Sequence, residues 1–168
     1  MKRLLTALLL LGPLYGLAAC GKETTVPGNP AGTDQTPGGG NNEPDGSVYR
    51  IRITVAGNAL TANLDDNTTV KDFVSLLPMT VNMTDFAGAE KIFYLPRKLS
   101  TDVAEAGVRP VTGDIAYYAP WGNIAVFYND AAYSSSLYRI GTVVGGIGAF
   151  STDGDINNVT IELLETNK

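Results

Sequence analysis

The first segment with a regular apolar pattern is residues 47–55. Every second residue from Tyr49 to Val55 is apolar, and the residues between them are arginine or threonine. A period of two is typical of a strand that buries one face and exposes the other. The turn-forming pair Gly57-Asn58 follows, and the alternation resumes over residues 60–64. We therefore expect a β-hairpin at the start of the folded part of the chain.

The apolar spacing changes from strand-like to helix-like after residue 67. Thr69, with Asp72 three residues later, is compatible with the start of a helix. Apolar residues at positions 70, 73, 74 and 77 fall on one helical face, and Pro78 would end the helix. We expect this to be the only substantial helix.

The rest of the chain consists of short apolar runs separated by Gly, Pro, Asn and Asp. With the first hairpin they make about eight strands and one helix, and no helical pattern separates the later strands. This arrangement favours a sandwich or a closed barrel over a parallel α/β sheet. The expected later strands are residues 79–84, 91–95, 113–119, 123–128, 138–144 and 159–164.

Residues 1–19 have the pattern of a signal peptide. Lys2 and Arg3 precede an apolar stretch over residues 4–19, which is shorter than the about 20 residues that a membrane-spanning helix needs. The stretch ends in Leu17-Ala18-Ala19-Cys20-Gly21, which resembles a bacterial lipobox. The resemblance implies lipidation of Cys20 and cleavage before it. The alternative is an ordinary secreted protein with a cysteine there by chance.

The predicted lipid anchor also predicts a location. It implies a protein held to a membrane of the bacterial cell envelope. No aspartate follows Cys20, so the usual inner-membrane retention signal is missing. We expect the outer membrane, with the domain facing the periplasm or the surface, in preference to the inner membrane.

The chain after Cys20 divides into two parts by composition. Residues 21–47 hold seven glycines and four prolines and almost no aliphatic side chain, so they cannot bury enough apolar surface to fold. We expect residues 20–47 to be a lipidated, flexible tether. Residues 48–168 are long enough for one hydrophobic core, and we expect them to form a single domain.

The composition excludes several classes of function. The 168 residues contain no histidine and one cysteine, so a Ser-His-Asp or Cys-His catalytic system, an imidazole zinc site and an intrachain disulfide are excluded. A net charge of −5 gives no basic surface for nucleic acid. Residues 153–158 begin like a calcium loop but lack the sixth-position glycine and the twelfth-position glutamate, so we interpret them as a turn. We expect no metal and no cofactor.

Three segments resemble a known family. They are residues 85–100, residues 113–128 and the glycine-punctuated residues 138–146, and the second contains Gly-Asp-Ile-Ala-Tyr-Tyr-Ala-Pro-Trp-Gly-Asn. These segments are similar to the small bacterial cyclophilin-like family, over nearly all of residues 49–165. The resemblance implies a mainly β fold, a closed eight-stranded, mostly antiparallel cyclophilin-like barrel capped by about one α-helix.

The catalytic motif of true cyclophilins is missing from the chain. Prolyl isomerases of that fold use an arginine in a Phe-His-Arg setting, and this sequence has no histidine and no Phe-x-Arg. We therefore expect no catalytic residue and favour a domain, expected to be monomeric, that binds a peptide or a small molecule. One alternative is a divergent prolyl isomerase that acts on envelope proteins, and a second is a structural subunit that docks a partner.

Aromatic and charged residues cluster in the segments that carry the resemblance. Aromatic rings offer a large contact area, and an arginine among them suits a carboxylate or carbonyl group. For each aromatic residue the alternative is packing inside the barrel. Glu90 would either orient Arg97, act as a general base if buried, or form a solvated ion pair with Lys91. The candidate ligand-binding residues are Glu90, Tyr94, Arg97, Trp121, Phe127 and Tyr128.

Overall fold

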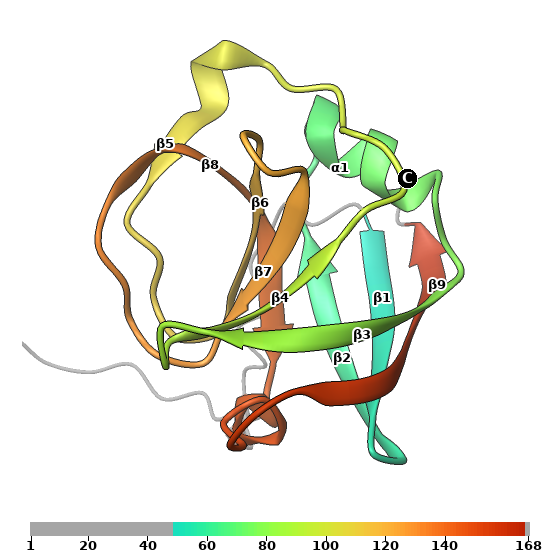
Figure 1. Cartoon of the computed structure of the whole chain (residues 1–168). Helices are drawn as coiled ribbons and strands as arrows, with labels where there is room; N and C mark the ends of the chain where they lie inside the picture. The colour runs from blue at the N-terminus through green and yellow to red at the C-terminus, as the bar shows by residue number, and fades with distance from the viewer. Residues whose placement is uncertain (1–48, 167–168) are drawn as a thin grey trace, which may run out of the picture. The chain divides into compact units, whose positions relative to one another are not determined.

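The computed structural model describes residues 49–166, so the predicted signal peptide, Cys20 and the tether lie outside the described residues. The described part contains nine strands, one α-helix and two 3-10 helices (Figure 1). None of its helices is long and apolar enough to span a membrane. The elements are β1 (Tyr49–Val55), β2 (Asn58–Leu64), α1 (Thr68–Val74), β3 (Met79–Phe86), β4 (Glu90–Tyr94), η1 (Val103–Glu105), β5 (Ala106–Val108), β6 (Asp114–Tyr118), β7 (Asn123–Phe127), β8 (Ser134–Val144), η2 (Ile147–Ala149) and β9 (Ile156–Thr166).

Eight of these strands close into a barrel. Neighbouring strands follow the order β2-β1-β9-β3-β4-β7-β6-β8, and β8 returns to pair with β2, with Leu64 opposite Gly141. Every pairing is antiparallel. The prediction of a closed eight-stranded, mostly antiparallel barrel with one α-helix is confirmed. The ninth strand, β5, was not predicted; it is only three residues long and pairs with β8 alone.

The first hairpin forms as predicted, with its turn one residue earlier. Val55 already pairs with Asn58, so the turn consists of Ala56 and Gly57. Both turn residues have positive φ angles, 48° and 83°. Two-residue hairpin turns of this kind match the right-handed twist of the flanking strands, which explains why the strands stay in register.

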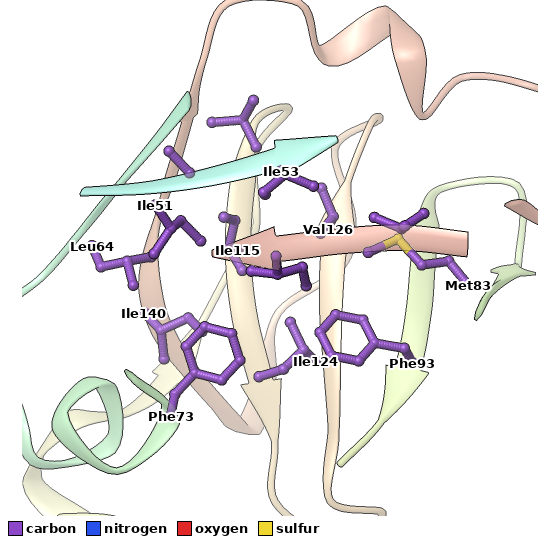
Figure 2. Packing of buried hydrophobic residues seen from close by; sticks show 14 of the residues in the cluster. Ile51, Ile53, Leu64, Phe73, Met83, Phe93, Ile115, Ile124, Val126 and Ile140 are labelled. Atoms are coloured by element: carbon purple, nitrogen blue, oxygen red, sulfur yellow. The ribbon is translucent and has the colours of Figure 1, made fainter. Parts of the chain in front are cut away.

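Helix α1 is shorter than predicted at its C-terminal end and starts one residue earlier. Asn67 is its N-cap, because its side-chain oxygen accepts a hydrogen bond of 2.8 Å from the backbone N–H of Val70. The helix ends at Val74, four residues before Pro78. Its buried residue Phe73 points into the barrel interior, between Ile140 and Ile124 (Figure 2).

The wall formed by β4, β7 and β6 is apolar on both faces. Successive strand residues point to opposite faces, so Phe93, Ile124 and Val126 join the interior core (Figure 2). The alternate residues of these three strands, together with Leu137 of β8, form a second buried cluster on the outer face: Ile92, Ala116, Ala125, Phe127 and Leu137. A barrel wall needs only its inner face to be apolar. The second cluster therefore shows that the outer face of this wall is also a packed apolar surface.

Candidate functional site: an outer pocket on the barrel wall

Paired residues on the outer face of β3, β4, β7 and β6 form three rows. Directly paired residues of antiparallel strands point to the same face and lie about 5 Å apart, so each row is a continuous line of side chains. The first row is Phe86, Glu90 and Phe127; the middle row is Ile92, Ala125 and Ala116; the third row is Tyr94, Asn123 and Tyr118.

This face is hollow along its middle row because two of the side chains there are small. Ala125 and Ala116 are small, whereas the rows on either side carry aromatic side chains. A pocket of about 330 Å³ lies over this face, and we call it the outer pocket. Its lining residues come from β3, β4, β6, β7, β8 and two connecting segments: Phe86, Glu90, Ile92, Tyr118, Trp121, Asn123, Ala125, Phe127, Ala131, Ala132, Ser134 and Leu137.

Trp121 stands at the edge of the outer pocket, in the turn between β6 and β7. Its ring contacts Phe86 at 5.6 Å between centroids and Tyr118 at 5.4 Å, with interplanar angles of 85° and 88°. The turn is fixed by Gly122, whose φ is 73° and whose N–H donates to the carbonyl of Tyr118 at 2.9 Å. Half of the Trp121 side chain is exposed, so the ring keeps surface that a ligand can cover.

The opposite side of the outer pocket is the segment that follows β7. Asp130 accepts hydrogen bonds from both the backbone N–H and the hydroxyl of Thr112, at 2.8 and 2.9 Å. The next residue, Ala131, lines the pocket and donates its N–H to the carbonyl of Pro110 at 3.1 Å. These bonds hold the segment against the loop before β6, so the pocket wall is tied on both sides.

Glu90 is the one charged residue among those that line the outer pocket. It is half-buried, and its carboxylate has no hydrogen bond or ion pair within residues 49–166. Burial raises the pKa of this carboxyl from 4.5 to about 7, because removal from water disfavours the charged form. Near neutral pH the pocket therefore holds a carboxyl group close to its midpoint of ionisation.

Asn123 is the second polar group that lacks a partner. Only 2% of the residue is exposed, and its side-chain oxygen Oδ1 is buried without a hydrogen bond in the described part of the chain. A buried unsatisfied acceptor costs about 1–3 kcal/mol. Asparagine is also disfavoured in strands, yet here it begins β7 and lines the outer pocket. Asn123 Oδ1 is therefore a buried acceptor at the wall of the outer pocket, and no residue in the described part of the chain satisfies it.

The ion pair between Glu90 and Lys91, one of the three roles considered for Glu90, does not form: Lys91 pairs with Asp85. Adjacent residues of a strand point to opposite faces, and Lys91 is completely buried on the inner side. Its Nζ donates to Asp85 Oδ1 at 2.7 Å and to the carbonyls of Thr152 and Gly154, both at 2.6 Å. The interior lysine thus fastens the segment before β9 to β4, and leaves Glu90 without a counter-charge.

Tyr128 belongs to the same interior network and does not line the outer pocket. Its hydroxyl donates to Asp85 Oδ1 at 2.6 Å, and Lys91 Nζ lies 5.3 Å from the centre of its ring. The hydrogen bond to the Asp85 carboxylate raises the pKa of Tyr128 to about 12. The side chain holds β3 and the end of β7 together.

Arg97 also lies away from the outer pocket, and its partner is Asp72 instead of Glu90. Its NH1 and NH2 groups donate to the two carboxylate oxygens of Asp72 at 2.9 and 2.6 Å. With a further bond from the Ser100 N–H, Arg97 holds the pKa of Asp72 well below its usual range. These contacts tie the segment after β4 to α1. Tyr94 is exposed in the third row and is not a lining residue.

The structure thus brings together three of the six candidate ligand-binding residues. Glu90, Trp121 and Phe127 line the outer pocket, whereas Tyr94, Arg97 and Tyr128 do not. Sequence reasoning missed Asn123, whose signal was an amide at the start of an apolar strand. Within residues 49–166, no group of three metal-ligating side chains lies together.

The closed barrel and its aromatic-lined wall define a cyclophilin-like β-barrel protein. Residues 53–162 match the sequence profile of the Cyclophilin-like family, and the chain belongs to that family. The solution structure of a hypothetical protein from Archaeoglobus fulgidus is similar, with a TM-score of 0.55 and 20% identity over 72% of this chain and 98% of that one. At that identity the likeness shows the fold alone. No curated protein matches the chain.

Proposed function

We propose that this protein is a lipid-anchored binding protein of the bacterial cell envelope that holds a peptide or a small molecule in the outer pocket, without prolyl isomerase activity. The observation that carries the proposal is the pairing of an aromatic-lined hollow with two polar groups, Glu90 and Asn123, that have no partner in the described part of the chain. Binding sites are typically concave and mostly apolar, with few polar groups that fix orientation.

The anchor part of the proposal rests on sequence. Cys20 follows small residues at the end of an apolar stretch, and acyl chains on it would hold the protein at a membrane surface. A tether of 27 residues (21–47) would then let the barrel bind ligands away from the bilayer.

The absence of isomerase activity is proposed from the chemistry of the pocket lining. Weakening the resonance of a prolyl peptide bond takes a strong donor beside the imide, because the barrier is about 18–20 kcal/mol. No lysine or arginine lines the outer pocket, and Arg97 is held by Asp72. A coupled proline-isomerisation assay tests this directly; a rate above the uncatalysed one would favour the divergent isomerase instead.

Binding in the outer pocket is tested with a neutral solvatochromic dye whose emission rises in apolar surroundings. We expect one dye per chain in the wild type and loss of binding in Ala132→Phe, since Ala132 is an exposed residue at the pocket edge. The matched control is Ala59→Phe on β2, which also exposes a new ring but lies outside the lining. Equal binding by both variants would show that the outer pocket is not the site.

A further inference from the structure

The only charge that lines the outer pocket is negative. Glu90 is the only charged lining residue. Lys98 reaches the turn that carries Trp121, but its Nζ donates to the carbonyl of Pro120 at 3.3 Å and the residue does not line the pocket. Asp130, in the segment after β7, is occupied by Thr112. A ligand that enters the pocket therefore meets an unpaired carboxylate and no cationic side chain.

At the entrance of the outer pocket, Trp121 contacts two further aromatic rings, Phe86 and Tyr118. Phe86 and Tyr118 each stand nearly perpendicular to Trp121, at centroid distances of 5.6 and 5.4 Å. Phe86 is 40% and Trp121 50% exposed, so both rings keep surface that a ligand can contact. An ammonium group over the face of such a ring, within about 6 Å of its centroid, is held by cation–π attraction.

Glu90 and Phe86 lie in the first row of the pocket, and Asn123 and Tyr118 lie in the third row. The Trp121 ring contacts both Phe86 and Tyr118. Glu90 is opposite Phe127, and Asn123 is four residues before Phe127 on β7. At about 3.3 Å per residue, the two rows are about 13 Å apart along the strand. The floor between them is apolar, formed by Ile92 and Ala125.

We infer that the outer pocket takes an organic cation, an alkylammonium head on an apolar stem that carries a hydrogen-bond donor. The inference rests on the proposed function and names the ligand class for it. The head lies among Phe86, Trp121 and Glu90, the stem covers the apolar floor, and the donor bonds to Asn123 Oδ1. The ionised Glu90 carboxylate would repel an anion, and a purely apolar ligand would leave the Glu90 carboxyl without a partner.

The experiment compares two probes of the same shape with the full chain. One is a trimethylammonium with a six-carbon stem that ends in a hydroxyl; the other is the uncharged isostere in which carbon replaces the nitrogen. Trp121 is the only tryptophan of the sequence, so its fluorescence reports binding at the pocket. At about pH 9, where Glu90 is ionised, we expect the cation to bind at least about 10-fold more tightly than the isostere.

Two variants identify the source of that preference. Glu90→Gln keeps the shape of the side chain and removes its charge, so the preference for the cation should fall several-fold while binding of the isostere is kept. Glu162→Gln, on β9, removes one negative charge outside the outer pocket and should leave the preference unchanged. An equal fall in both variants would overturn the inference, because the effect would then come from net charge alone.

The outcomes separate this inference from the proposed function. If both probes bind equally, the pocket is a binding site but not a cation site, and the inference fails alone. If neither probe binds, the inference fails, and the dye test with Ala132→Phe decides the proposed function independently. Competition by phosphatidylcholine vesicles would show that the cation is a lipid headgroup; vesicles that leave the probe bound would show that it is a free molecule.

Discussion

The raised pKa of Glu90 predicts a specific loss of stability as the pH increases. The carboxyl has a pKa of 4.5 in water and about 7 in the folded chain. Between these values the folded state holds a proton that the unfolded state has released, so the free energy of unfolding falls as the pH rises. The stabilising contribution is complete below about pH 4.5 and is lost as the pH passes through about 7.

The size of the effect follows from the pKa change. A tenfold change in proton affinity corresponds to about 1.4 kcal/mol, which would give about 3 kcal/mol for a fully buried carboxyl. Glu90 is only half-buried, and water screens part of the cost, so we expect about 2 kcal/mol. Glu90→Gln has no charge to bury. It should match the wild type near pH 4 and be about 2 kcal/mol more stable near pH 8.

Urea unfolding followed by circular dichroism, repeated from about pH 4 to pH 8, measures this difference. Subtracting the wild-type curve from the variant curve cancels the other titrating groups. Glu162→Gln is the control, because Glu162 is half-exposed in an ion pair of 3.8 Å with Arg52 and should change stability by less than about 1 kcal/mol at every pH. Parallel curves for Glu90→Gln and the wild type would refute the burial of an unpaired carboxyl. The outer pocket would then lack the polar group that we assign to Glu90.

Three further substitutions test the fold and the anchor. Lys91→Met removes a buried ammonium that makes three hydrogen bonds and should lower the free energy of unfolding in urea by about 3–5 kcal/mol. The control Arg52→Met, at an exposed position, should lower it by less than about 1 kcal/mol. Similar losses in both variants would contradict the interior hydrogen-bond network of Lys91. Gly141→Ala places a methyl group against the backbone carbonyl of Asn63 at the β2–β8 seam, so a wild-type melting temperature would argue against the closed barrel. Cys20→Ser should move the protein from the membrane fraction to the soluble one, and continued membrane association would rule out the lipid anchor.

Most of the strands were predictable because each is a local apolar run or alternation bounded by turn-forming residues. Tyr49 to Val55 alternate strictly, and the turn at Gly57 is marked by residue type, so the first hairpin needs no distant contact to be recognised. Strand β5 has only three residues and contains Gly107, so it has no period to detect. It exists because β8 offers a free edge for pairing, which is a property of the assembled barrel.

The candidate site was half predictable. Residue type identified Glu90, Trp121 and Phe127, because aromatic side chains gathered in one region are typical of binding surfaces and Glu90 lies among them in the sequence. Residue type also selected Arg97, which the fold holds against Asp72 on α1. Asp72 and Arg97 are 25 positions apart, and only the tertiary structure brings them together.

The mainly β fold, the single helix of the described part and the excluded chemistry could be predicted from the sequence, because strand periods, caps and composition are local properties. The lack of histidine also removed part of the active site that cyclophilin isomerases use. The residue pattern alone allowed a sandwich or a closed barrel, and the tertiary structure shows the closure, the burial of Lys91 and the separation of Glu90 from it. These depend on which strands pair and which face each side chain takes, and both are set by contacts between residues far apart in the chain.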